Sequence, residues 1–133
     1  MDINEYLMNT YDPERFLRPA VVCADGFRVS VQASHGHYCT PRVDNAVFYT
    51  HVELGYPSKE TPEWYEYAED YTQLTFMQSV YHWIKTKILK QWDFLSFYPT
   101  NTIYSWVPVE LVDRILVRHG GISNIFDVVL ESE

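Results

Sequence analysis

The chain lacks the features that mark secreted and membrane-spanning proteins. Two cysteines in 133 residues are too few for a disulfide framework, so we expect both thiols to be reduced. No apolar run approaches the roughly 18 residues that a bilayer-crossing helix needs. The first residues show no basic segment followed by an apolar one, as a signal peptide would. These absences predict a cytoplasmic protein.

Basic residues are also scarce. Lys and Arg number 10 against 18 Asp and Glu, which gives a formal net charge of -8. A negative surface repels phosphate backbones, and this argues against direct binding of nucleic acid across a broad face. The same charge favours a partner protein with a basic groove, although acidic surfaces also keep small proteins in solution.

Aromatic residues, in contrast, are abundant, with 11 Tyr, 7 Phe and 4 Trp making up 17% of the chain. A single domain of this length has a limited interior, so we expect some of these rings at the surface. Exposed rings are typical of recognition surfaces. The composition therefore predicts one acidic domain, residues 1–133, that acts by binding rather than by catalysis.

Apolar alternation predicts a small antiparallel sheet. Residues Ala20–Cys23 and Phe27–Ala33 flank Asp25-Gly26, a dipeptide that favours a two-residue type I′ hairpin turn. The second of these segments alternates apolar and polar residues, as does Ala46–Leu54, which we expect to form a third strand. A further strand is expected around Ile103–Val107.

Helical spacing of apolar residues is clearest in two later segments. It predicts a long helix over residues 74–92 and a shorter one that starts at Val107-Pro108 and ends at Gly120-Gly121. Another short helix is expected from Pro62. The predicted fold class is therefore α+β, with a sheet of three to five strands packed against two or three helices. We expect a helical and aromatic insertion at about residues 60–105.

No complete catalytic motif accompanies this pattern. The segment closest to a site is His35-x-His37-x-Cys39, with Cys23 on the preceding strand. Imidazoles and thiols bind zinc, and a cysteine beside a histidine is the pair that a thiol enzyme uses. Structural zinc sites usually separate paired ligands by two to four residues, which these do not, so a polar packing loop is the competing interpretation. We predict no cofactor and keep a metal- or thiol-dependent enzyme or ligand-binding protein as the alternative function.

A run of acidic residues with interleaved rings is the second candidate. Ordered carboxylates on a helix can imitate a phosphate strand, whereas a charge run can also be no more than a solvated face. Rings together with carboxylates suit an interface with a basic protein. The predicted partner-binding residues are Glu63, Trp64, Glu66, Tyr67, Glu69 and Asp70.

The segment between the last two predicted helices is rich in rings. In the core these rings would cover the sheet, and at the surface they would form a patch for a partner or for self-association. We expect about half of them in the core. The rings are Trp92, Phe94, Phe97, Tyr98, Tyr104 and Trp106.

Three stretches resemble small proteins encoded by phages and prophages of Gram-positive bacteria. They are Tyr11–Glu14, Val21–Ser34 with its continuation His37–Arg42, and Val107–Ile122. The resemblance implies an accessory gene on a mobile element, a context in which anti-CRISPR proteins are the best-known inhibitors. We therefore expect an inhibitor of a bacterial nuclease defence system that binds a basic host protein, such as a CRISPR effector, as a nucleic-acid mimic in the host cytoplasm. A phage structural or assembly protein that self-associates is the alternative in the same context.

Overall fold

The computed structural model describes residues 1–69 and 98–124. Four strands form one antiparallel sheet in the order β1-β2-β3-β4, and helices pack around it, which confirms the predicted α+β class. The elements are α1 (Ile3–Asn9), β1 (Val21–Val22), β2 (Arg28–Gln32), β3 (His51–Gly55), the 3-10 helix η1 (Pro62–Tyr67), β4 (Ile103–Pro108) and α4 (Val109–Arg118).

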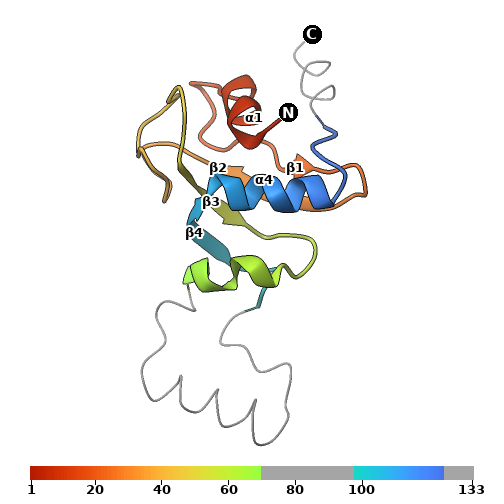
Figure 1. Cartoon of the computed structure of the whole chain (residues 1–133). Helices are drawn as coiled ribbons and strands as arrows, with labels where there is room; N and C mark the ends of the chain where they lie inside the picture. The colour runs from red at the N-terminus through yellow and green to blue at the C-terminus, as the bar shows by residue number, and fades with distance from the viewer. Residues whose placement is uncertain (70–97, 125–133) are drawn as a thin grey trace, which may run out of the picture.

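The core lies between the sheet and α4. This helix crosses in front of the sheet, with α1 on one side of it and η1 on the other (Figure 1). Val29 and Val31 of β2 are fully buried, as the alternation predicted, and Ile115 of α4 is equally buried. Each such side chain contributes roughly 1.5 to 3 kcal/mol of gross burial free energy. The apolar periodicity of the sequence therefore determines which faces of the sheet and of α4 are buried.

The hairpin between β1 and β2 forms where it was predicted, but with a different turn. The Gly26 N–H donates to Cys23 O at 2.9 Å, and the Cys23 N–H donates to Phe27 O at 2.8 Å. Of the Asp25-Gly26 pair only Gly26 has a positive φ, at 93°, whereas a type I′ turn needs two. The loop is therefore the three-residue kind that ends in a left-handed glycine, and the Asp25 carboxylate accepts the Phe27 N–H within it.

The end of α4 is also as predicted. The Gly120 N–H donates to Val117 O at 2.9 Å and the Gly121 N–H to Leu116 O at 2.8 Å, the two bonds of a Schellman motif. The Ala24 N–H then donates to Gly121 O, which ties the helix end to the hairpin.

The predicted third strand is wrong in its first half, because β3 begins at His51. Residues 46–50 belong instead to a loop that wraps around the buried Tyr49 ring. The Tyr49 hydroxyl donates to Val43 O at 2.7 Å and accepts the Ala46 N–H at 3.1 Å. Asn4 of α1 exchanges two hydrogen bonds with the Tyr49 backbone. One buried phenol thus outweighs the strand preference of its neighbours.

Several predictions fall outside the described residues. They include the helix over residues 74–92, the rings Trp92, Phe94 and Phe97, and the acidic Asp70. Of the other rings between the last two helices, Tyr104 is fully buried while Tyr98 and Trp106 are exposed. Among the helices that the structure describes, none has the length and apolar character to cross a membrane.

Candidate protein-binding surface

The acidic segment, residues 60–69, follows β3 and includes η1. Because η1 is a 3-10 helix with three residues per turn, Glu63 and Glu66 project on the same side of it. Glu60 and Glu66 are exposed, whereas Glu63 and Glu69 are half-buried. The Ala68 backbone forms a β-bridge with Tyr104, so the end of the acidic segment lies against β4.

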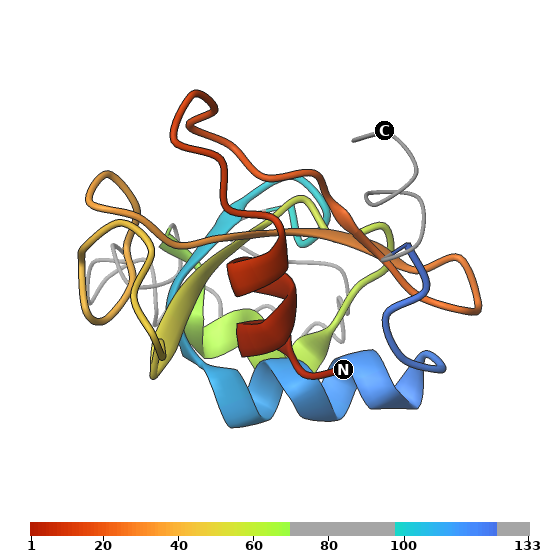
Figure 2. The ribbon, with the colours of Figure 1, turned by 90° about the horizontal axis from the view of Figure 1, so that it is seen from above.

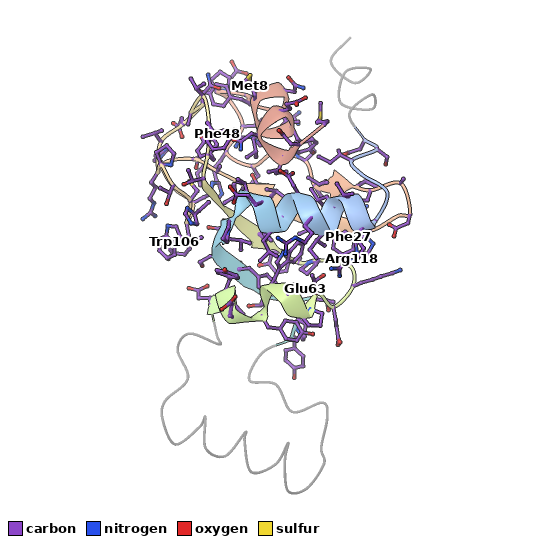
Figure 3. All side chains as sticks on the ribbon, in the orientation of Figure 1. Met8, Phe27, Phe48, Glu63, Trp106 and Arg118 are labelled. Carbon is purple, nitrogen blue, oxygen red and sulfur yellow. The ribbon has the colours of Figure 1, made fainter. Side chains whose placement is uncertain are left out.

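Glu63 is engaged within the molecule. Its carboxylate forms an ion pair with Arg118 in the last turn of α4 (Figure 3). A hydrogen bond from its own backbone, followed by the bond from Arg118, lowers the pKa of Glu63. The charge of Glu63 is therefore largely balanced before any partner arrives, and the ion pair links η1 to α4.

Two other carboxylates of the acidic segment lie close to tyrosines, Glu60 to Tyr65 and Glu66 to Tyr67. Burial first, and then the adjacent carboxylate, raises the pKa of each phenol. Glu60 and Glu66 are therefore exposed carboxylates with an aromatic ring beside each.

Trp64 lies on the other side of η1, inside the core. Its ring is fully buried and lies 6.2 Å from the Phe27 ring and 6.1 Å from the Tyr104 ring, between centroids. Within the described part of the chain, its Nε1 has no hydrogen-bond partner. The ring of Trp64 offers no surface to a partner in this conformation, and its role here is to anchor η1.

The histidine and cysteine candidates are only partly brought together. The hairpin of residues 20–28, which contains Cys23, and the loop of residues 34–50 lie at opposite ends of the sheet (Figure 2). His35 is exposed and pairs with Asp44 at 2.9 Å. His37 is buried, with its Nδ1 2.7 Å from Ser34 Oγ and its ring stacked on Phe16. No metal-binding group of three or more His, Cys, Asp or Glu side chains occurs among residues 1–69 and 98–124.

Neither thiol has the environment of a nucleophile. Burial, reinforced by Asp25, raises the pKa of Cys23 to about 11. Burial also raises the pKa of Cys39, whose Sγ donates to Ser34 O at 3.2 Å. A thiol enzyme needs the opposite shift, because the thiolate is the reactive form. The bonds of His37 and Cys39 to Ser34 instead stabilise the loop of residues 34–50.

An open cleft of about 280 Å³ lies beside this loop, and sequence reasoning did not indicate it. Arg18, one of its lining residues, is buried and donates to Leu7 O at 3.1 Å and Ala33 O at 2.7 Å. It thereby joins the end of α1 to the end of β2. Because these acceptors are backbone carbonyls of two elements, Arg18 acts as a structural bridge.

A third surface is centred on Trp106, a residue that is 46% exposed (Figure 3). Its ring centroid lies 4.9 Å from that of Tyr38, and the Arg42 guanidinium carbon lies 5.3 Å from the Tyr38 centroid. The aromatic content predicted surface rings, but no local pattern joined Trp106 to Tyr38 and Arg42, because a bulge and a loop bring them together.

Comparisons of the chain with protein-family models, with curated proteins and with solved structures gave no match. The arrangement of these surfaces is therefore the basis for assigning a function.

Proposed function

We propose that this protein is an inhibitor that acts by binding a basic protein through the acidic segment. The phage-protein resemblance of the sequence suggests the class of partner, a nuclease of a bacterial defence system. Bound there, the carboxylates would occupy positions that nucleic-acid phosphates otherwise take.

The observation that carries this proposal is the placement of two exposed carboxylates, Glu60 and Glu66, beside the rings of Tyr65 and Tyr67 on one short segment. Carboxylates together with rings suit an interface with the Arg and Lys side chains of a basic protein. The formal charge of -8 adds long-range attraction to a basic surface.

The test measures inhibition of DNA cleavage by a panel of purified RNA-guided nucleases from Gram-positive bacteria. We expect the protein to inhibit at least one of them and to lose affinity as ionic strength rises. The double variant Glu60→Gln with Glu66→Gln should inhibit about tenfold more weakly, which corresponds to about 1.4 kcal/mol.

The matched control is Glu14→Gln with Glu110→Gln, which makes the same change in net charge at two exposed positions outside the acidic segment. If both double variants weaken inhibition equally, net charge rather than the acidic segment is responsible. If the wild-type protein inhibits no nuclease of the panel, the proposed function is wrong.

A further inference from the structure

Trp106 has an unusual backbone for a strand residue. Its φ is +50°, in the left-handed region that residues with a β-carbon rarely adopt, although Trp106 lies within β4. Val107 pairs with Val52 and Tyr104 with Leu54, so Ser105 and Trp106 together face Glu53 alone. This is a β-bulge, and bulges of this kind redirect side chains next to binding and active sites.

The bulge directs the Trp106 N–H away from β3, to Tyr38 O at 3.2 Å. The Tyr38 N–H in turn donates to a Glu53 carboxylate oxygen at 2.8 Å. These two bonds hold the Tyr38 backbone beside Trp106, and the Tyr38 ring contacts the indole. Trp106 is nevertheless 46% exposed, so part of its ring faces solvent.

Arg42 completes what we call the bulge cluster, Tyr38, Arg42 and Trp106. Its Nε donates to His35 O at 3.1 Å, and none of the ion pairs among the described residues includes it. An exposed guanidinium without a carboxylate is notable in a chain with 18 acidic residues. Trp, Tyr and Arg are also the residue types that dominate binding hot spots.

The bulge cluster and the end of the acidic segment are both attached to β4. Ala68 pairs with Tyr104, two residues before Trp106 on the same strand. A partner that covers Glu66 and Tyr67 would therefore extend along β4 to the indole.

We infer that the bulge cluster is the apolar anchor of the same interface, an inference that rests on the proposed function. The occupant is a recess on the basic partner protein, with apolar walls for the indole and a carboxylate that pairs with Arg42. Backbone strain costs on the order of 1 to 3 kcal/mol, and such strain concentrates at binding sites. The acidic segment then supplies attraction and the bulge cluster supplies most of the affinity.

The experiment titrates variants against the nuclease that the wild-type protein inhibits. We expect Trp106→Ala to weaken binding about 30-fold and Arg42→Glu about tenfold. Tyr98→Ala, which removes an exposed ring outside the bulge cluster, should change affinity less than twofold. Thermal unfolding of each variant checks that the fold survives, and Trp106→Phe, which keeps a ring, should recover part of the loss.

Unchanged affinity of Trp106→Ala and Arg42→Glu for a nuclease that the wild type inhibits would overturn the inference and leave the proposed function standing. Absence of any inhibition by the wild type would overturn both. Fluorescence anisotropy with guide RNA alone provides the last arm, because binding of RNA that depends on Trp106 would show that the occupant is a nucleic acid and not a protein.

Discussion

Left-handed backbone falls on different residue types in two regions at either end of the sheet. At the hairpin end, residues 21–28 with the C-terminus of α4, the left-handed positions are glycines, Gly26, Gly120 and Gly121. At the bulge end, residues 34–50 with Trp106, the left-handed positions are Asn45 and Trp106. The hairpin end adopts these conformations at low cost because glycine has no β-carbon. The bulge end retains side chains there, as does Tyr56, which follows β3 outside both regions and has a φ of 52°. Asn adopts this conformation more readily than other residues with a β-carbon, so Trp106 is the costly position of the bulge end.

Side-chain contacts follow the same division. At the hairpin end, His119 stacks on Phe27 with 4.0 Å between ring centroids, and its Nδ1 lies 2.7 Å from Asp25 Oδ2. At the bulge end, Val47 is 85% exposed and Phe48 55% exposed on a loop that Tyr49 holds in place. One end of the sheet is therefore a stable end with packed side chains, and the other is a presenting end, with apolar side chains exposed to solvent.

The largest expected effect is at the hairpin end. A β-carbon on Gly120 would lie 2.8 Å from Ala24 Cβ, and the φ of Gly120 is +93°. We expect Gly120→Ala to lower the free energy of unfolding by about 3 kcal/mol, from the left-handed backbone and the overlap together. Urea denaturation of the full chain measures the change.

Gly121→Ala is the control for this effect. Gly121 has a similar φ of +85°, but a β-carbon there would meet nothing within 4 Å, so only the backbone cost of about 1 kcal/mol applies. Equal losses for the two variants would show that the contact between the helix end and the hairpin adds nothing.

These glycines also explain why the hairpin end could be predicted from sequence. Asp25-Gly26 and Gly120-Gly121 are local signals, and the apolar alternation of β2 needs no distant partner to be recognised. The bulge end depends on contacts across the chain, such as Asn4 with Tyr49 and Trp106 with Tyr38. No local pattern encodes those contacts, so the start of β3 was misplaced and the bulge cluster was not recognised.

The second prediction examines strain at the bulge itself. In a strand interior, alanine is normally more stabilising than glycine by about 0.5 to 1 kcal/mol. At the φ of +50° of Trp106 the order should reverse, so that Trp106→Gly is more stable than Trp106→Ala by about 1 kcal/mol. Both variants lose the same ring, so their difference isolates the backbone. Urea denaturation of the two variants measures that difference.

Ser105→Gly and Ser105→Ala form the matching pair one residue earlier, where φ is not positive. There the usual order should hold, with alanine the more stable. If Trp106 follows the usual order as well, the bulge is not strained and the two ends do not differ in this respect.

Lowering the pH should remove the stabilising contribution of His37 at the bulge end before that of Asp25 at the hairpin end. Burial, opposed in part by Glu53, lowers the pKa of His37 below 6.5, so its stabilising contribution is complete above pH 6.5 and is lost as the pH falls towards the lowered value. At the hairpin end, the bond from the Phe27 N–H and then that from His119 lower the pKa of Asp25 below 3.8. The contribution of Asp25 is therefore lost only below that pH.

The measurement is the free energy of unfolding from pH 8 to pH 3 for the wild type, His37→Gln and Asp25→Asn. The difference between wild type and His37→Gln should shrink as the pH falls below 6.5, while the difference for Asp25→Asn should stay constant until about pH 4. A His37→Gln difference that does not vary with pH would show that this histidine titrates normally.

The sequence shows where the acidic segment lies but not what its residues contact, as individual residues illustrate. The position of the acidic run follows directly from the order of the residues. The partner of Glu63, Arg118, lies 55 positions away and could not. Whether Trp64 faces solvent depends on how η1 rotates against β4, and the interleaved pattern was compatible with either side.

The smallest expected effect concerns the ion pair of Glu63 with Arg118, which lies between the two ends. The side chains of Arg118 and Glu63 are 54% and 34% exposed, so solvent screens the pair and Glu63→Gln should lower the free energy of unfolding by only about 0.5 kcal/mol. Because Arg118 already balances this charge, Glu63→Gln should also weaken partner binding less than Glu66→Gln, although each removes one negative charge. Calorimetric titration of the two single variants compares them directly. A larger loss of affinity for Glu63→Gln would mean that the partner displaces Arg118 from Glu63. In that case η1 would belong to the surface that binds the partner.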